Sequence, residues 1–140
     1  MSNKLRRRRI YAAVAVIERR GRILICQRHV RDSFGAYWEF PGGKRESGES
    51  WKTCLRRELR EELGIAVRSI TPYGRMRHEF EDGTVSFRVF RCAIARGKPR
   101  PLDAQALQWV ARGDLKKYRF PPANRVLIEK LSRQALRGII

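Results

Sequence analysis

Apolar residues near the start of the chain occur in short, nearly unbroken runs of the kind that form buried strands. Residues 10–17 form one such run and residues 23–26 another, and Arg20-Gly21 between them is typical of a turn. We therefore predict a hairpin of two buried strands. A short extended segment over residues 38–40 follows. It ends at Pro41-Gly42-Gly43 because proline and glycine interrupt regular structure.

The spacing then changes to that of a helix. Apolar residues recur every four positions and form one stripe: Trp51, Leu55, Leu59 and Leu63. Ser50 is a favoured residue type for a helix N-cap, and Gly64 suits the left-handed position that ends a helix. We predict a helix between these two residues, with one apolar face and one polar face.

The rest of the chain is predicted to form strands and a final helix. Strands are expected over residues 67–76 and 85–95, around a turn at residues 81–84, with a short strand at residues 108–111. Pro121-Pro122 opens the last helix. Its inner side is predicted to carry Val126, Leu127, Leu131 and Leu136. Strands and helices do not alternate regularly, so the sequence predicts an α/β sandwich with a mixed sheet.

The composition indicates one folded domain with an unusual charge. The chain has 140 residues, of which 42% are hydrophobic. Its 32 Lys and Arg, of which 25 are Arg, outnumber 14 Asp and Glu, which gives a net charge of +18. Such a charge favours anionic partners, namely nucleotides, nucleic acid or anionic lipid. No apolar run approaches the roughly 18 residues that a membrane helix needs, so no membrane span is expected.

The N-terminus and the cysteines bear on the cellular setting. Residues 1–9 form a basic tail with four consecutive arginines, which we expect to be poorly ordered to about Arg8. The tail is expected to add at most weak, sequence-independent affinity for nucleic acid. It lacks the cleavage site of a secretory signal. Cys26, Cys54 and Cys92 are odd in number and far apart, so we expect reduced core thiols in a cytoplasmic protein.

Acidic residues are scarce, and six of the 14 lie between residues 39 and 62. Glu58, Glu61 and Glu62 fall at spacings of three and four on the predicted helix and so share its polar face. Like charges so arranged destabilise a helix by roughly a few tenths of a kcal/mol per pair, which a hard cation such as Mg²⁺ would offset. The alternative is a solvated acidic face with neighbouring arginines as ion-pair partners. These residues alone leave both interpretations open.

The loop before this helix has the residue types of a phosphate or metal site. Gly42-Gly43 lets the backbone approach a phosphate group or a metal ion closely. Lys44 and Arg45 supply cations for phosphate oxygens, and Glu49 is expected within reach of Arg57.

From Gly43 onward the chain resembles the Nudix box. Gly43 is followed after five residues by Glu49. After seven more comes Arg57-Glu58-Leu59-Arg60-Glu61-Glu62-Leu63-Gly64-Ile65, which matches GX5EX7REUXEEXGU, with U aliphatic, at every specified position. Trp38 to Lys44 and Phe120 to Asn124 resemble segments of the MutT branch of this family, the 8-oxo-dGTP diphosphatases. The resemblance covers nearly the whole chain after about residue 10.

The resemblance implies a Nudix-type α/β/α sandwich over residues 10–140 and a Mg²⁺-dependent hydrolase, with Mn²⁺ as an alternative ion. Such an enzyme converts 8-oxo-dGTP, or a related purine nucleoside triphosphate, into the monophosphate and pyrophosphate. The metal ligands of the family carry over to Glu58, Glu61, Glu62 and the carbonyl of Gly42. Glu49 is expected to orient Arg57, which positions the glutamates. Glu58 is our first choice for the general base, and Asp103 is the second.

Four further residues are expected to contact the substrate. By resemblance, Asn124 reads the purine edge; alternatively, it caps the last helix by accepting a backbone N–H. Phe40 is expected to stack on the base or to be a core residue. Lys44 and Arg28 are expected to hold phosphate, although a solvated surface position suits Arg28 equally well.

Two other functions fit the sequence. One is a Nudix hydrolase that acts on another nucleoside diphosphate derivative or on a nucleic-acid 5′ end. The other is a basic nucleic-acid-binding module on the same fold, which the +18 charge favours. The intact box argues against a pure binding module, and no base-stacking motif interleaves aromatic residues with the arginines. We expect a cytoplasmic enzyme, monomeric or dimeric, that acts on a small nucleotide and has no membrane partner.

Overall fold

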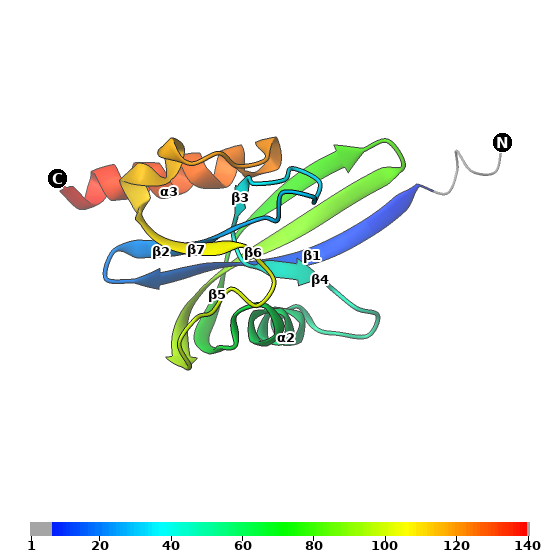
Figure 1. Cartoon of the computed structure of the whole chain (residues 1–140), viewed down its shortest axis with the longest axis horizontal. Coiled ribbons are helices and arrows are strands. Elements are labelled where there is room, and N and C mark those ends of the chain that lie inside the picture. The colour runs from blue at the N-terminus through cyan, green and yellow to red at the C-terminus, as the bar shows by residue number, and fades with distance from the viewer. Residues whose placement is uncertain (1–6, 140) are drawn as a thin grey trace.

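A mixed seven-stranded sheet lies between two helices (Figure 1). The computed structural model describes residues 7–139, with side chains described as far as residue 134. Helix α2 (Trp51–Leu63) covers one face of the sheet, and helix α3 (Arg125–Ile139) covers the other. The predicted α/β/α sandwich is therefore confirmed. None of the described helices is long and apolar enough to cross a membrane.

Strand β1 organises the sheet. The strands are β1 (Arg8–Arg19), β2 (Arg22–Gln27), β3 (Trp38–Glu39), β4 (Gly42–Lys44), β5 (Ala66–Phe80), β6 (Gly83–Arg96) and β7 (Ala106–Ala111). β1 runs parallel to β6 and antiparallel to β2 and β4. β5 pairs with β6, and β3 and β7 both pair with β2. The sheet is mixed because this one parallel pair stands among antiparallel pairs. A parallel pair requires a long crossover connection between its two strands.

The apolar run in β1 is buried on both of its faces. Ala13 and Ile17 pack on the α2 side, against a core that includes Leu55 of α2. Val14 and Val16 pack on the α3 side, in a second core that includes Leu131 of α3. Successive side chains of a strand point to opposite faces, so a strand between two helices needs an unbroken apolar run rather than an alternating one.

Helix α2 begins and ends where the sequence predicts. The side chain of Ser50 accepts a hydrogen bond from the N–H of Thr53 at 3.1 Å. Gly64 adopts the left-handed conformation, with φ of 69°, and its N–H donates to the Arg60 carbonyl at 3.0 Å. These two caps confirm the predicted helix and keep its register fixed relative to the loop before it.

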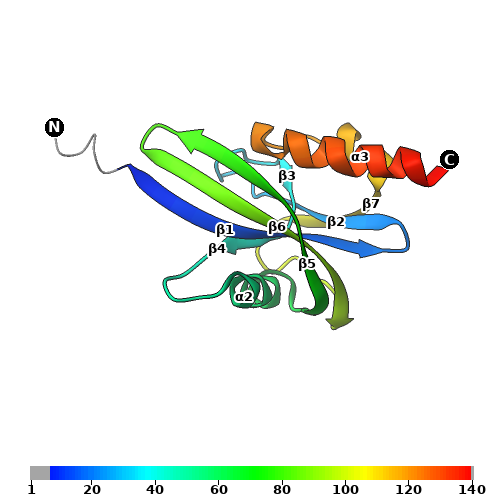
Figure 2. The same cartoon turned by 180° about the vertical axis from the view of Figure 1, so that it is seen from behind.

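Strands β1, β5 and β6 are longer than predicted. β1 begins at Arg8, whose N–H donates to the Asp82 carbonyl at 2.8 Å, and Arg9 is paired with Thr84. Arg8 and Arg9 therefore belong to the folded domain, whereas residues 1–6 of the predicted tail lie outside the described residues. Backbone pairing does not require apolar side chains, so the strands continue where the hydrophobic pattern has ended. Together β1, β5 and β6 form a ribbon that projects beyond both helices (Figures 1 and 2).

The C-terminal segment departs from the prediction in detail. Two 3₁₀ helices that the pattern did not indicate, η1 (Arg112–Lys117) and η2 (Pro122–Asn124), precede α3. Leu127 and Leu131 are buried as predicted, but Val126 is 67% exposed, so its predicted inner position is wrong. Leu127, Ile128 and Leu131 share the inner face of a helix with 3.6 residues per turn, and Val126 lies beyond the edge of that face. The Leu136 side chain lies outside the described residues.

Candidate active site

The pairing of β4 with β1 brings the Gly42-Gly43 backbone against the polar face of α2. Gly42 has φ of 151° and passes so close to the Ala13 carbonyl that a Cβ would overlap it. A Cβ on Gly43 would overlap the carboxylate of Glu58. Gly42 therefore requires glycine, and a side chain at Gly43 would displace the Glu58 carboxylate. The predicted approach of this backbone to a phosphate group or a metal ion stays a prediction.

Arg57 connects the loop to the acidic face of α2. Its Nε and Nη2 donate to the two carboxylate oxygens of Glu49 at 2.6 and 2.8 Å. Its Nη1 donates to Glu58 at 2.9 Å and to Glu61 at 3.2 Å, and Nη2 also donates to the Lys44 carbonyl at 3.0 Å. One planar guanidinium thus holds three carboxylates and the loop backbone, which an ammonium group lacks the geometry to do.

The ion pair between Glu49 and Arg57 has clear electrostatic consequences. The hydrogen bonds from Arg57, with a further one from the N–H of Glu46, lower the pKa of Glu49 to about 2. The same hydrogen bonds, which the Glu49 carboxylate accepts, raise the pKa of Arg57 above its ordinary value. Both groups are therefore charged across the physiological pH range. The structure places these two residues as the sequence predicted, and their role in catalysis stays a prediction.

Glu62 lies on the inner edge of the acidic face. Its Oε2 accepts a hydrogen bond from the Gly42 N–H at 3.2 Å. Burial raises its pKa to about 8, because this one hydrogen bond does not offset the loss of solvent. Burial also raises the pKa of Glu58, although Arg57 opposes the shift. The polar face of α2 therefore carries carboxylates whose negative charge is only partly offset by hydrogen bonds and cations of the protein.

Glu39, a further acidic residue, lies near Glu62, and the sequence assigned no role to it. Glu39 of β3 pairs with Arg28 at 2.7 Å, and burial raises its pKa above the ordinary value despite this ion pair. The negative charges of Glu39 and Asp103 both act to raise the pKa of Glu62. Asp103, the second candidate for the base, is therefore near enough to act electrostatically on both Glu62 and Glu39. The one sequence signal that could have indicated Glu39 as a site residue is its position in the segment just before Gly42-Gly43.

The chemistry of these donors fits a hard divalent cation. Carboxylate and carbonyl oxygens are the ligands that Mg²⁺ prefers. Within residues 7–139, no group of three or more His, Cys, Asp or Glu side chains is arranged to hold a metal ion, since Glu58 and Glu61 are turned to Arg57. The Glu62 carboxylate is half-buried and accepts a hydrogen bond from the Gly42 N–H, which offsets its charge only in part. This arrangement fits a cation at the acidic face. The assignment of Gly42, Glu58, Glu61 and Glu62 as ligands stays a prediction.

Arg28 and Lys44, both predicted to bind phosphate, lie at the ends of strands, whereas Phe40 is in the core. Arg28 lies directly after β2 and is half-buried, with Nε donating to the Ser33 carbonyl at 2.7 Å, while the Lys44 side chain is exposed at the end of β4. Phe40 is 4% exposed in the core on the α3 side and stacks on Phe120 at 5.2 Å between ring centroids. This burial favours the core role of Phe40 that the sequence left open, and a contact with the base stays a prediction.

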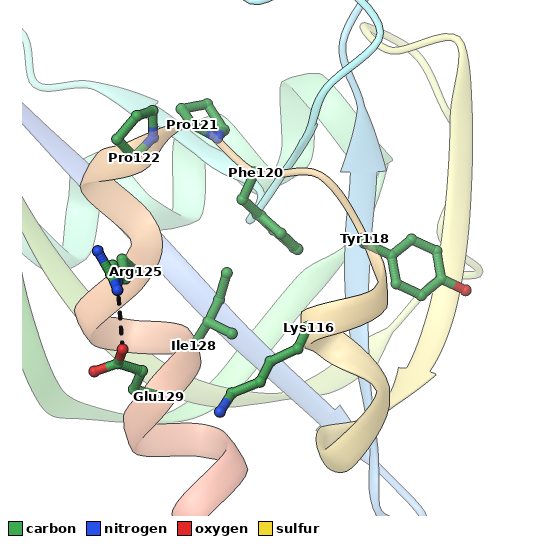
Figure 3. Close-up of a pocket in the computed structure, with 8 residues that line it drawn as sticks. All are labelled: Lys116, Tyr118, Phe120, Pro121, Pro122, Arg125, Ile128 and Glu129. Atoms are coloured by element: carbon green, nitrogen blue, oxygen red, sulfur yellow. Dashed lines mark ion pairs between the residues drawn. The ribbon is translucent and has the colours of Figure 1, made fainter.

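Asn124 is buried in η2 and is engaged in a local contact. Its Nδ2 donates to the Pro121 carbonyl at 3.3 Å, so the side chain acts as a donor to the turn rather than as the N–H acceptor that the capping alternative required. A pocket of about 400 Å³ lies nearby, between η1, Phe120 and α3 (Figure 3). Neither Asn124 nor any other predicted site residue lines that pocket. The structure therefore does not join it to the acidic face of α2.

Comparison with known proteins agrees with this geometry. Residues 12–130 match the family model of the NUDIX domain, so the chain belongs to the Nudix family. An 8-oxo-dGTP diphosphatase of Haemophilus influenzae is 36% identical over 111 residues, which cover 79% of this chain and 82% of that protein. A CTP pyrophosphohydrolase of Escherichia coli is 33% identical over 120 residues, which cover 86% of this chain and 89% of that protein.

Solved structures lead to the same branch of the family. A MutT Nudix hydrolase from Burkholderia pseudomallei has a TM-score of 0.79 to this chain at 30% identity, covering 87% of this chain and 97% of that one. Together with the relatives above, this similarity makes the chain a MutT-like Nudix hydrolase, as the box and its flanking segments predicted.

Proposed function

We propose that the chain hydrolyses 8-oxo-dGTP, or a related purine nucleoside triphosphate, to the monophosphate and pyrophosphate. The reaction depends on Mg²⁺, with Mn²⁺ as an alternative ion. The observation that carries the proposal is the position of Arg57, which holds Glu49, Glu58 and Glu61 beside the glycine backbone of β4. A polyphosphate can approach closely at a backbone without side chains. The relatives named 8-oxo-dGTP diphosphatase support the choice of substrate and products.

Each residue of the acidic face has a distinct part in this proposal. Glu58, Glu61, Glu62 and the Gly42 carbonyl hold the divalent ion, which neutralises phosphate charge and lowers the pKa of the attacking water. Glu49 keeps the guanidinium of Arg57 in one orientation, and Arg57 in turn keeps Glu58 and Glu61 in place. Glu58 accepts a proton from the water, with Asp103 as the second candidate for this role.

Binding of the substrate requires exchange of contacts that the structure shows. Lys44 is exposed beside the loop and can reach a phosphate without rearrangement. Arg28 would exchange its contact with Glu39 for a phosphate oxygen, and Asn124 would exchange the Pro121 carbonyl for the base. Phe40 would reach the base only if Phe120 moved from its stacked position.

A pyrimidine nucleoside triphosphate is the second candidate substrate. The relative named CTP pyrophosphohydrolase covers most of the chain, and the Asn124 amide is already engaged by Pro121. The phosphate chemistry of the acidic face is the same for both candidates, so only the base distinguishes them.

The test is a comparison of kcat/KM on 8-oxo-dGTP, dGTP, dCTP, CTP and a 5′-triphosphorylated oligonucleotide. Each substrate is assayed with Mg²⁺, with Mn²⁺ and with a chelator, and the products are separated by ion exchange. We expect the highest kcat/KM for 8-oxo-dGTP, with pyrophosphate as product and no turnover in the chelator. The highest value for CTP would favour the second candidate. Release of inorganic phosphate, or no hydrolysis of any substrate, would contradict the proposal.

A further inference from the structure

One face of the projecting ribbon is rich in arginine. Directly paired residues of neighbouring strands share a face, and residues two apart on one strand do as well. Ala13 packs in the core under α2, so its partner Arg88 points to the same side of the sheet. By the same register, that side also carries Arg9 and Tyr11 of β1 and Arg75 and Arg77 of β5.

The fold places aromatic rings among these arginines. Trp51, the first residue of α2, lies edge-on to Tyr11 with 6.2 Å between ring centroids. The guanidinium carbon of Arg45 lies 5.0 Å from the Trp51 centroid and 5.5 Å from that of Tyr11. The guanidinium carbon of Arg88 lies 5.0 Å from Trp51 as well. We call this surface the basic sheet face: Arg9, Tyr11, Arg45, Trp51, Arg75, Arg77 and Arg88.

The basic sheet face is open to solvent, and most of its positive charge is not paired with acidic side chains. Tyr11 is 38% exposed, and a hollow of about 390 Å³ beside it is lined by Arg9, Lys44 and Arg45 among others. Two acids share the surface. Glu46 lines the hollow, and Glu79 pairs with Arg77 at 3.2 Å. In the two views the ribbon extends past the end of α2, so no helix within residues 7–139 covers this part of the sheet (Figures 1 and 2).

We propose that single-stranded nucleic acid binds across the basic sheet face. Phosphate groups would pair with the arginines, whose planar guanidinium groups match phosphate oxygens, and unpaired bases would stack on the exposed ring of Tyr11. The surface extends over three strands, which suits a chain of phosphates better than one free nucleotide. An exposed aromatic ring surrounded by cations favours unpaired bases over a duplex, whose bases are already stacked. This binding is independent of the proposed hydrolysis.

Fluorescence anisotropy with labelled oligo(dT) and oligo(rU) of about 20 nucleotides tests the proposal, since single-strand sites span up to about 16 nucleotides. The test variant combines Arg75→Ala, Arg77→Ala and Arg88→Ala. The matched control combines Arg56→Ala, Arg60→Ala and Arg96→Ala, which removes the same charge around a hollow whose lining has no aromatic residue. The test variant should bind at least about tenfold more weakly, and its slope of log K against log salt should be shallower by about 2. The control should change much less.

A second pair of variants isolates the stacking contribution. Tyr11→Ala should weaken binding by about tenfold, whereas Tyr11→Phe keeps the ring and should bind like the parent chain. A hairpin duplex with the same number of phosphates and vesicles of anionic lipid serve as competing ligands, and thermal unfolding checks that each variant folds. Equal weakening by both triple variants would overturn the proposal, because it would indicate a response to net charge alone. Equal affinity for the duplex, or binding to vesicles without binding to oligonucleotides, would overturn it too.

Discussion

The guanidinium of Arg57 contacts the carboxylate of Glu49 at two points, 2.6 Å from Nε to Oε2 and 2.8 Å from Nη2 to Oε1. Two contacts fix the rotation of the guanidinium, and its Nη1 donates to Glu58 and Glu61. The position of two carboxylates on α2 therefore depends on a carboxylate in the loop before that helix.

This relationship predicts that Arg57→Lys lowers kcat by about 10- to 100-fold, the range found when groups behind metal ligands are changed. A lysine keeps the charge but cannot pair with Glu49 and direct a second donor to Glu58 at once. Steady-state kinetics on the preferred nucleotide measure the effect. Arg56→Lys is the control, since Arg56 is the exposed neighbour on the same helix. Similar rates for both variants would contradict the positioning role.

The low pKa of Glu49 predicts a particular dependence of stability on pH. Its pKa is about 2 in the folded chain and near its ordinary value of 4.5 when unfolded, so the unfolded chain binds the proton more readily. The stabilisation from Glu49 is therefore complete above about pH 4.5 and is lost as the pH falls towards 2. Urea unfolding of the parent chain and Glu49→Gln should give a constant difference between pH 7 and 5 that shrinks below it. A difference that stays constant down to pH 3 would contradict this assignment.

Substitution of Glu62 tests the acidic face directly. Glu62→Gln keeps the size of the side chain and an acceptor for the Gly42 N–H, but it removes the charge. We expect activity to fall by at least about 100-fold, the scale of losing one important electrostatic group in an active site. The melting temperature should not fall, because burial raises the pKa of Glu62 to about 8 and so already favours its uncharged form, which glutamine resembles. Glu81→Gln, in the exposed turn between β5 and β6, is the matched control. Near-parental turnover by Glu62→Gln would exclude the proposed ligand role.

Local sequence patterns predicted helix α2, its two caps and the contact between Glu49 and Arg57. The stripe, Ser50 and Gly64 are all within one helix, and the contact of Glu49 with Arg57 spans only eight residues. Interactions of this kind depend on residues near in sequence, so periodicity and capping rules suffice to predict them. Gly42-Gly43 passes close to Ala13 and Glu58, whereas its predicted approach to a phosphate group or a metal ion stays a prediction.

Other features depend on register between distant strands, which no local pattern contains. Arg9 and Arg75 share a face only because β1 pairs with β6 in parallel and β6 with β5 in antiparallel register. The apolar pattern ends at Met76, so the polar ends of the strands were not predicted. The proximity of Glu39 to Glu62 arises in the same way, from the pairing of β3 with β2. These juxtapositions became visible only in the folded chain.

The three cysteines provide a test of the core. All are free and buried, and burial raises the pKa of Cys54 to about 11 and that of Cys92 to about 12, with Cys26 also raised. The thiolate is the reactive form, so buried thiols with raised pKa values should be inert. We expect no reaction with Ellman's reagent at pH 8 over minutes in the folded chain and reaction of all three thiols in guanidinium chloride. Rapid reaction of one thiol in the folded chain would contradict the burial.

Asn124 distinguishes recognition of the base from a purely structural role. Its amide donates to the Pro121 carbonyl in the turn before α3, so Asn124→Ala should lower the melting temperature slightly. If the amide also pairs with a purine edge, the substitution removes a contact worth about 1–3 kcal/mol. The ratio of kcat/KM for 8-oxo-dGTP to that for dGTP should then fall, with KM rising.

The matched control for Asn124 is Gln134→Ala on α3. The Gln134 amide oxygen accepts hydrogen bonds from Tyr73 at 2.5 Å and from Arg112 at 2.7 Å, so its loss should affect stability alone. Both variants are expected to unfold at lower temperature than the parent chain, and only Asn124→Ala should change the ratio between the two nucleotides. An unchanged ratio in Asn124→Ala with a lowered melting temperature would assign Asn124 to the turn, and base selection would then rest on other residues.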